Sequence, residues 1–313
     1  MATVQLLSSF ISPPIPSSPS SSTNQLPPFF AFTHNYLCAV LLLLPPLAYL
    51  TYKDYHSFLS LGPGGTPYNF YGYCIITSLR LLALRNPRVP GSVPEGLKHN
   101  GYLPKSGITK RDASRPMVTG IAPHRQMNQR PTREIFNLLS SSLQNLADNY
   151  PRRLRIATSC FEKHCPGLFS KKQVNKTCNG EIVHAHPSDG SMHMTLHPAD
   201  AKIVIEAGWG ERHPLARGGW CRRFVPIGFV MIYAPRTEEE VGLIMDIVKA
   251  GIGWVSGETL DESEAGLYPK EMETNDDLNR CDSGRCYANA NSTVKDCESD
   301  VVQNVANAVM GVA

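Results

Sequence analysis

Short apolar stretches predict strands in the middle of the chain. Residues 116–122, 154–161 and 227–233 are rich in apolar and β-branched side chains and are bounded by turn-forming residues. Two further stretches, 181–186 and 191–197, are joined by Pro187-Ser-Asp-Gly190, a sequence typical of a tight turn. These two stretches are therefore predicted to form a β-hairpin.

Helices are predicted between these strands. Over residues 131–149, apolar side chains recur at the spacing of one helical face. Pro198 opens a second helix that ends near Gly208, because a proline at an early helical position loses no hydrogen bond. Thr237-Glu-Glu-Glu240 matches a capping box and starts a third helix that reaches about Ala250. Strands that interleave with short helices indicate an α+β domain with a mixed or antiparallel sheet and flanking helices.

The two ends of the chain differ from this folded part. Residues 1–28 are rich in Ser and Pro, and residues 257–313 are polar and acidic without periodicity, so both are predicted to be disordered. One folded domain is expected over residues 114–256, preceded by a membrane-proximal segment at 53–113. Within that segment the apolar stretch 69–84 fits either a helix on a bilayer or a helix in the core, and the sequence does not choose between them.

An apolar segment at 29–52, without a formally charged residue, predicts a transmembrane anchor. Its length suffices to cross a hydrocarbon core of ~30 Å, although Pro45 and Pro46 would kink the helix. The alternative, a cleaved signal peptide, lacks a basic region before the apolar run. Basic residues follow the segment and none precedes it, which favours a single-pass protein of the endoplasmic reticulum with its domain in the cytosol. The glycosylation patterns at Asn175 and Asn291 oppose that orientation.

Charge is distributed unevenly along the chain. The formal net charge is +3, but from Glu258 onward there are twelve acidic and four basic side chains, which leaves about +11 for the part before it. No Lys/Arg-rich run or aromatic RNA-binding signature accompanies this basic part. Nucleic acid is therefore not an expected partner, whereas a small-molecule substrate and a lipid bilayer are.

The nine cysteines are scattered along the chain, and a domain of this size needs no disulfide framework. We therefore expect mostly free thiols. Cys281 and Cys286 have a spacing that suits a metal or a small disulfide loop, but no second cysteine pair with ligand spacing follows.

The predicted hairpin gathers histidines on one face. Because alternate side chains of a strand share a face, His184 and His186 project the same way, as do His193 and His197 on the returning strand. The four-residue connection places His184 opposite His193, with Cβ atoms ~5 Å apart. We therefore expect the rings of His184, His186 and His193 to converge.

Three converging imidazoles suit two kinds of chemistry. They could share a divalent metal in an open three-histidine arrangement, whose remaining position holds water or substrate. Without a metal, a shielded imidazole pair could act as a general base and a hydrogen-bond donor near neutral pH. The alternative without function is that these histidines lie on a polar sheet face or inside the core.

Two loops add candidate substrate contacts. Gly208-Trp-Gly-Glu-Arg-His-Pro-Leu215 offers Trp209 as a flat apolar wall, Arg212 as a permanent cation and His213 as a titratable ring. Tyr233-Ala-Pro-Arg236 places a phenol and a guanidinium at the end of a strand, where side chains commonly line a pocket. The alternative interpretations are a helix-terminating loop with Trp209 in the core, and a helix cap at Arg236.

These blocks together resemble the fungal luciferases and their non-luminous relatives. The resemblance runs in order from about residue 53 to residue 256 and covers neither end of the chain. It rests on Lys53-Asp-Tyr55, Asn69-Phe-Tyr-Gly-Tyr73, Thr158-Ser-Cys-Phe-Glu162, Glu181-Ile-Val-His-Ala-His186, Gly208-Trp-Gly-Glu-Arg-His-Pro-Leu-Ala216 and Ile232-Tyr-Ala-Pro-Arg-Thr-Glu-Glu-Glu240.

The resemblance implies an activity and a set of site residues. Luminous members of the family, which also carry an N-terminal membrane helix, oxidise 3-hydroxyhispidin with molecular oxygen and need no organic cofactor. By this resemblance the family residues are matched by His184, His186, His193, Arg212 and His213. His197 is not matched. A non-luminous relative is expected, because most proteins with these blocks come from dark fungi.

The leading hypothesis is oxygen-dependent oxidation of an enolic or phenolic small molecule, such as an α-pyrone or a related polyketide of secondary metabolism. One of the three hairpin histidines would remove the enol proton, and Arg212 with His213 would stabilise the developing charge. Trp209, Tyr233 and Arg236 would contact the substrate. A metal-dependent lyase or hydrolase with the same histidines is one alternative, and a membrane-attached binding protein without catalysis is the other.

Overall fold

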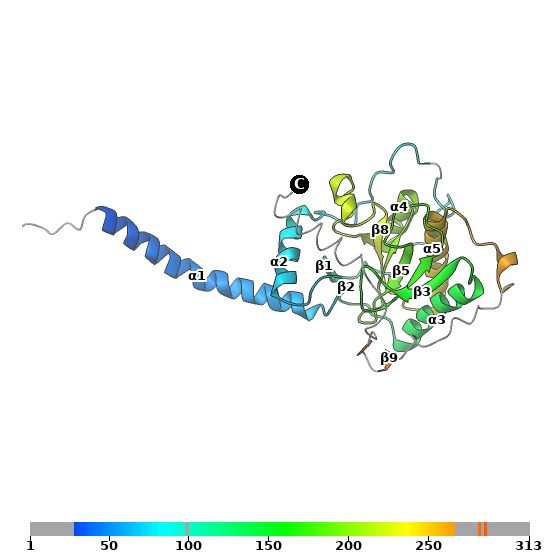
Figure 1. The fold of residues 1–313 in the computed structure, drawn as a ribbon, viewed down its shortest axis with the longest axis horizontal. Helices are drawn as coiled ribbons and strands as arrows, with labels where there is room; N and C mark the ends of the chain where they lie inside the picture. The colour runs from blue at the N-terminus through cyan, green and yellow to red at the C-terminus, as the bar shows by residue number, and fades with distance from the viewer. Residues whose placement is uncertain (1–27, 98–99, 267–280, 283–284, 287–313) are drawn as a thin grey trace, which may run out of the picture. The chain divides into compact units, whose positions relative to one another are not determined.

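The computed structural model describes residues 28–97, 100–266, 281–282 and 285–286 (Figure 1). By its internal contacts the chain divides into two units, Met1–Lys53 and Asp54–Ala313. The second unit contains the main sheet, the histidine hairpin and two hydrophobic clusters.

Six antiparallel strands form the main sheet, in the spatial order β3-β4-β5-β6-β8-β7. In chain order the strands are β3 (Leu154–Thr158), β4 (Pro166–Ser170), β5 (Glu181–Ala185), β6 (Met192–Thr195), β7 (Gly210–Arg212) and β8 (Phe229–Ile232). Every residue of β5 and β6 is buried. The histidine hairpin therefore lies in the middle of the sheet, covered on both faces.

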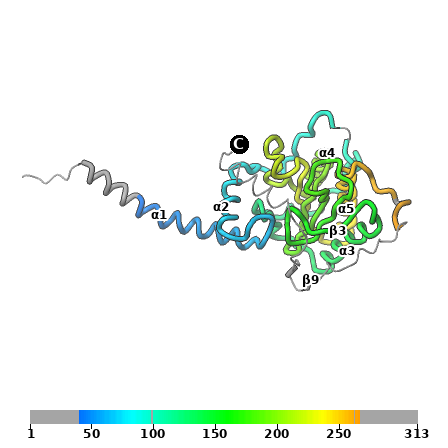
Figure 2. Tube along the Cα trace, in the orientation of Figure 1, coloured from blue at the N-terminus to red at the C-terminus, as the bar shows by residue number. Residues whose placement is uncertain are grey.

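Two long helices, α3 (Arg133–Asn149) and α5 (Glu238–Ser256), pack on each other and against the strands (Figure 1, Figure 2). Leu139 and Leu143 of α3 and Ile244 and Val248 of α5 belong to the main hydrophobic cluster. The ends of α5 follow from its sequence, because the Thr237 hydroxyl accepts a hydrogen bond from the third backbone N–H beyond it. At the other end Gly257 adopts the left-handed conformation that terminates many helices.

Shorter elements complete the second unit. They are α2 (Phe70–Leu79), α4 (Pro198–Glu206), the 3₁₀ helices η1 (Arg80–Leu82), η2 (Gly219–Arg223) and η3 (Glu262–Glu264), and the two-stranded sheets β1 (Val118–Gly120) with β2 (His124–Gln126) and β9 (Cys281–Asp282) with β10 (Arg285–Cys286).

A second hydrophobic cluster joins the region before residue 114 to the rest of the unit. Tyr73 and Ile76 of α2 pack there with Phe224 and Phe229. α2 begins at Asn69, whose side chain accepts a hydrogen bond from a backbone N–H of the first turn. The apolar stretch whose position the sequence left open therefore lies in a core.

The α+β class, the hairpin, the three predicted helices and the three predicted strands are confirmed, and the main sheet is antiparallel rather than mixed. Three short strands within the predicted domain at 114–256 were not predicted, namely β2, β4 and β7. They have three to five residues each and include Pro166, Gly167 and Gly210. Such short stretches carry too little alternation to be recognised, and glycine and proline argue against a strand.

The predicted anchor at 29–52 falls within α1 (Pro28–Ser60), which contains Pro45 and Pro46. In the part of the chain that the structure describes, no helix combines the length and the apolar character that a membrane crossing requires. The transmembrane prediction is therefore not supported. The disorder predicted for most of residues 1–28 and 257–313 falls outside the described residues and stays a prediction. In the described part of the C-terminal segment the prediction is wrong for Glu262–Glu264, which form η3, and for the paired strands β9 and β10.

Cys160 and Cys178 form a disulfide, which corrects the expectation of free thiols at these two positions. The bond links the segment after β3 to the segment before β5. Nothing in the spacing of the cysteines indicated it, because the pairing depends on which loops the sheet brings together. Cys74, Cys165 and Cys221 are thiols outside any disulfide, as expected. The side chains of Cys281 and Cys286, where a metal or disulfide loop was considered, are outside the described residues.

Candidate active site

The hairpin of β5 and β6 brings three histidines together as predicted. His184 pairs with His193 across the ladder, and the centroids of their rings are 5.4 Å apart. The ring of His186 lies 4.7 Å from that of His193. All three residues are 5% exposed or less. The predicted convergence of the imidazoles is therefore confirmed, and the rings are shielded from water.

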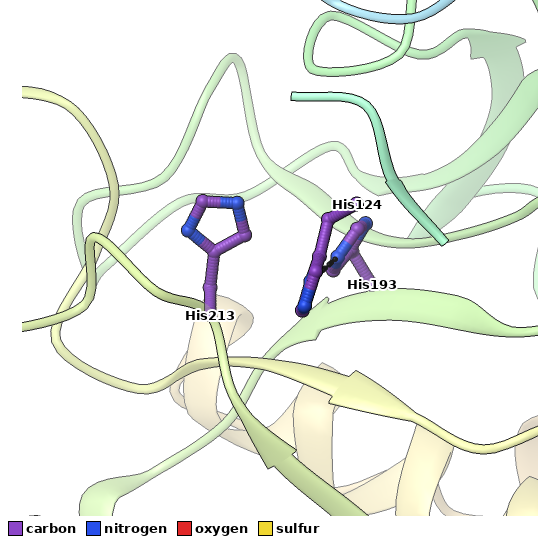
Figure 3. Close-up of side chains that lie close together, drawn as sticks. All are labelled: His124, His193 and His213. Carbon is purple, nitrogen blue, oxygen red and sulfur yellow. Dashed lines mark hydrogen bonds between the residues drawn. The ribbon is translucent and has the colours of Figure 1, made fainter. Parts of the chain in front are cut away.

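Two more histidines extend this group (Figure 3). His124, at the start of β2, stacks on His193 with ring centroids 5.3 Å apart, and its Nδ1 lies 3.1 Å from Nε2 of His193. His213, which follows β7, meets both of these rings edge-on. We call these five residues, at positions 124, 184, 186, 193 and 213, the histidine cluster. His124 was not predicted, because it lies on a three-residue strand that is far from the hairpin along the chain.

His184 is held by the carboxylate of Glu181. Its Nδ1 lies 2.6 Å from Oε1 of Glu181, which also accepts a hydrogen bond from the Ser159 hydroxyl, while Oε2 accepts one from the backbone N–H of Cys160. Side chains three residues apart would normally face opposite sides of a strand. Here the register between β4 and β5 shifts after Leu168. Leu168 pairs with Val183 but Phe169 pairs with Glu181, so Ile182 of β5 is an extra residue between the two pairs. This bulge aims Glu181 at the histidine.

His186 begins a second hydrogen-bonded chain that ends on a carboxylate. Its Nδ1 lies 2.9 Å from the Ser191 hydroxyl, which lies 2.5 Å from Oδ1 of Asp189. Asp189 also accepts a hydrogen bond from the backbone N–H of Ser191. The tight turn of the hairpin therefore supplies the groups that orient its own histidine.

Two further carboxylates border the histidine cluster. Oε1 of Glu211 lies 3.8 Å from Nε2 of His124, and its other oxygen accepts a hydrogen bond from the Tyr233 hydroxyl at 2.8 Å. Oε2 of Glu162 lies 3.9 Å from Nε2 of His186, and Glu162 is paired with the guanidinium of Arg125. Glu162, Glu181 and Glu211 lie in the blocks on which the family resemblance rests, but no carboxylate was predicted at the site. Their positions beside the histidines depend on how the folded backbone brings distant segments together.

Burial shifts the pKa of four of the five imidazoles downward. It lowers the pKa of His124 and His193 well below 6.5, and neighbouring imidazoles add to the effect. Burial lowers the pKa of His213 to about 4, against a hydrogen bond to the Ile121 carbonyl that raises it. For His186 burial again lowers the pKa, and the link to Asp189 opposes the shift. These four rings are therefore uncharged at neutral pH.

The structure does not bring Arg212 and His213 together as an anion clamp. Adjacent residues of a strand face opposite sides. His213 turns into the histidine cluster, whereas the Arg212 guanidinium lies beside Gly91 and donates a hydrogen bond to the Ala216 carbonyl. Arg236 is also engaged elsewhere, because it is paired with Glu240 in the first turn of α5.

The two predicted aromatic contacts are buried. Trp209 is 3% exposed, belongs to the main hydrophobic cluster and donates a hydrogen bond from Nε1 to the Thr109 carbonyl at 2.7 Å. Tyr233 is fully buried and bonded to Glu211. The aromatic rings that stack on the cluster are instead Phe161, against His184, and Phe229, against His193.

Among the described residues, two sets of three histidines have one nitrogen each within 4.8 Å of one another, which is the spacing of possible metal ligands. One set is His184, His186 and His193, as the sequence predicted, and the other is His124, His193 and His213. They share His193. In the second set the nitrogens of His213 already have backbone partners, since Nε2 lies 2.9 Å from the Ile121 carbonyl and Nδ1 accepts the N–H of Leu215.

The same region of the chain is similar to known proteins. A family model described as a luciferase domain matches residues 179–251, which span β5, β6, α4, β7, β8 and most of α5. Over 225 residues the chain is 31% identical to a luciferase of Armillaria mellea and 30% identical to a luciferase of Neonothopanus nambi. These alignments cover 66% of this chain and 82% and 81% of the two relatives. No solved structure matches the chain.

Proposed function

Since this chain belongs to the fungal luciferase family, we propose that it is an oxygen-dependent enzyme that oxidises an enolic or phenolic small molecule. The substrate class is an α-pyrone of the 3-hydroxyhispidin type or a related polyketide, and light emission is not part of the proposal. No organic cofactor is invoked, and molecular oxygen is the co-substrate.

The observation that carries this proposal is the burial of five imidazoles in mutual contact at the centre of the sheet. Burying several polar rings is costly, so a fold seldom retains such a group without a use for it. Oxidation of an enol or a phenol begins with loss of its proton, and imidazole is the side chain that most often accepts one. The Ser191–Asp189 chain behind His186 is the kind of link that orients such a ring and stabilises its cationic form.

A cavity of about 300 Å³ lies beside the β1–β2 turn, and none of the five cluster histidines is among its lining residues. Phe58, Ile76 and Ile121 supply apolar lining, while Asp54 and Arg80 supply polar groups. Ile121 belongs to both places, because its carbonyl faces Nε2 of His213. The volume is at the lower end of that of small-molecule sites, and the mixed lining suits a flat ring with polar substituents. The mixed lining of the cavity and its link to His213 through Ile121 support entry of the substrate through this cavity.

Oxygen consumption by the purified full-length protein tests the proposal. With a panel of hydroxylated α-pyrones and polyphenols, we expect at least one substrate to be oxidised. His186→Gln should lower kcat/KM for it by about 10²–10⁴-fold, the usual contribution of a general base. His164→Gln is the matched control, since His164 is exposed. A His186→Gln enzyme as active as this control would contradict the proposed role of the cluster.

Membrane attachment and a cytosolic domain stay predictions from the sequence. The observation in their favour is that large apolar side chains of α1 are exposed, among them Leu42, Leu43 and Leu47. Alkaline carbonate extraction of microsomes that contain the full-length chain tests attachment. Recovery in the membrane pellet would support it, and release into the supernatant would contradict it.

A further inference from the structure

We propose that His184, His186 and His193 bind one divalent ion of a first-row transition metal. One nitrogen of each lies within 4.8 Å of the other two, and all three side chains are shielded from water. Neutral imidazole is a preferred ligand of zinc, iron, copper and nickel ions. Binding of the ion does not depend on the proposed oxidation, because it can be measured without any substrate.

Two of the three nitrogens already have the spacing of neighbouring ligands. Nε2 of His186 and Nδ1 of His193 are 3.1 Å apart. With metal–nitrogen bonds of about 2.0–2.1 Å, this separation corresponds to a ligand–metal–ligand angle of about 95–100°. Such an angle lies between the octahedral and the tetrahedral values, so neither ring needs to move far to share an ion.

The third ligand nitrogen is Nε2 of His184. This buried atom has no hydrogen-bond partner, although an unsatisfied polar atom in a core is costly. In the neutral ring, with the Nδ1 proton donated to Glu181, the lone pair is on Nε2. A metal ion in the space shared with the other two histidines would satisfy it.

Behind each of the three histidines, on the side away from the shared space, lies a carboxylate. His184 contacts Glu181 directly, and His186 reaches Asp189 through the Ser191 hydroxyl. His193 completes the pattern on the far side of its ring. Its Nε2 lies 3.1 Å from Nδ1 of His124, whose Nε2 in turn lies 3.8 Å from Glu211. The 3.8 Å separation of His124 and Glu211 is longer than a hydrogen bond. The hydrogen bonds behind His184 and His186 are of the kind that fixes the tautomer and orientation of metal-binding histidines in known sites.

The charges around the site also favour a cation. Four buried carboxylates border the histidine cluster, those of Glu162, Glu181, Asp189 and Glu211. The guanidiniums of Arg125 and Arg88 pair with them, but Arg88 is half exposed. A divalent ion among neutral imidazoles would offset the remaining negative charge without any further buried side chain.

The second set of histidines is a weaker candidate, because both nitrogens of His213 are used by backbone groups. If the proposed oxidation takes place at this site, the ion also changes the role of the hairpin histidines. They would hold the ion rather than accept a proton, and the ion would stabilise the enolate oxygen as a Lewis acid.

Metal binding by the full-length protein, purified without a polyhistidine tag and stripped with a chelator, tests the inference. Equilibrium dialysis with Zn²⁺, and with Fe²⁺ in the absence of oxygen, should give about one equivalent bound. His184→Gln should abolish binding of this ion, whereas His213→Gln should retain it. Ser191→Ala, which removes only a hydroxyl behind His186, should weaken binding by about 10–100-fold. The rise in melting temperature with added Zn²⁺ should follow the same order.

Less than a tenth of an equivalent on the folded wild-type protein would overturn the inference, and so would loss of binding in His213→Gln with retention in His184→Gln. If His184→Gln does not fold, as judged by its melting curve, the Ser191→Ala variant is the test. A metal affinity of Ser191→Ala equal to that of the wild type would then overturn the inference. Oxygen consumption by a protein that binds less than a tenth of an equivalent of metal would leave the proposed function in place and overturn the metal site. Metal binding without oxidation of any compound in the panel would support the metal site and contradict the proposed function.

Discussion

Replacing Glu181 by glutamine tests whether the bulge in β5 holds the histidine hairpin in place. The Glu181 carboxylate accepts three hydrogen bonds, from the Ser159 hydroxyl, from Nδ1 of His184 and from the backbone of Cys160. An amide of the same size retains one acceptor oxygen and places an NH₂ group where the other was. At least one of the three donors then faces another donor, unless the imidazole changes its tautomer.

The expected loss follows from the number of bonds. A hydrogen bond to a charged group contributes about 1.5–3 kcal/mol, against about 0.5–1.5 kcal/mol for a neutral pair. Three bonds that each lose about 1 kcal/mol lower the free energy of unfolding of Glu181→Gln by about 3 kcal/mol. For a domain of this size, that corresponds to a fall in melting temperature of about 6–12 °C.

Urea titration followed by tryptophan fluorescence measures this difference. Glu258→Gln is the matched control, because Glu258 is an exposed carboxylate paired with Lys172, and its replacement should leave the curve nearly unchanged. If Glu181→Gln unfolds at the same urea concentration as the control, then the three short contacts contribute little and the account of the bulge is refuted.

Three further changes address the surroundings of the site. Trp209→Ala should lower the free energy of unfolding by about 3–5 kcal/mol in urea titration, because the ring fills the main core, and Trp209→Phe with unchanged KM would exclude stacking on a substrate. Burial raises the pKa of Asp200, so the folded protein takes up a proton that the unfolded chain has released; melting between pH 7 and 4 should show the wild type gaining stability over Asp200→Asn as the pH falls. Reduction of Cys160–Cys178 should cost about 3 kcal/mol in urea titration, as expected for a short closed loop, and identical curves with and without reductant would contradict this.

The parts of the site that obey a local rule were predictable from the sequence. Alternation along a strand and a four-residue turn place His184 opposite His193, and the ladder has that pairing. The separation of Arg212 from His213 was not predictable in this way, because β7 ends at Arg212 and is too short to be recognised from its sequence. The interpretation of Trp209 as a core residue was also open from the sequence, and the structure places the ring there.

The other parts of the site depend on long-range packing. His124 meets His193 across 69 positions of the chain, and β2 is too short to have a pattern of its own. Glu181 reaches its histidine only through a register shift against β4, and such shifts depend on the partner strand. Glu162 and Glu211 come from loops and a short strand whose positions are fixed by the sheet as a whole. None of these contacts leaves a periodic trace in the sequence.

The disulfide between Cys160 and Cys178 makes the redox state of the compartment that holds the domain readable from a chemical test. The backbone N–H of Cys160 donates a hydrogen bond to the Glu181 carboxylate, and the Cys178 carbonyl accepts one from the backbone N–H of Glu181. Thiols exposed to the cytosol remain reduced, whereas those in the secretory lumen become oxidised. Alkylation of the thiols in freshly lysed cells would therefore distinguish a domain in the cytosol, with both cysteines alkylated, from one in the secretory lumen, with both protected. A bacterial host with a reducing interior would yield protein in which the Cys160–Cys178 disulfide, near His184, is reduced.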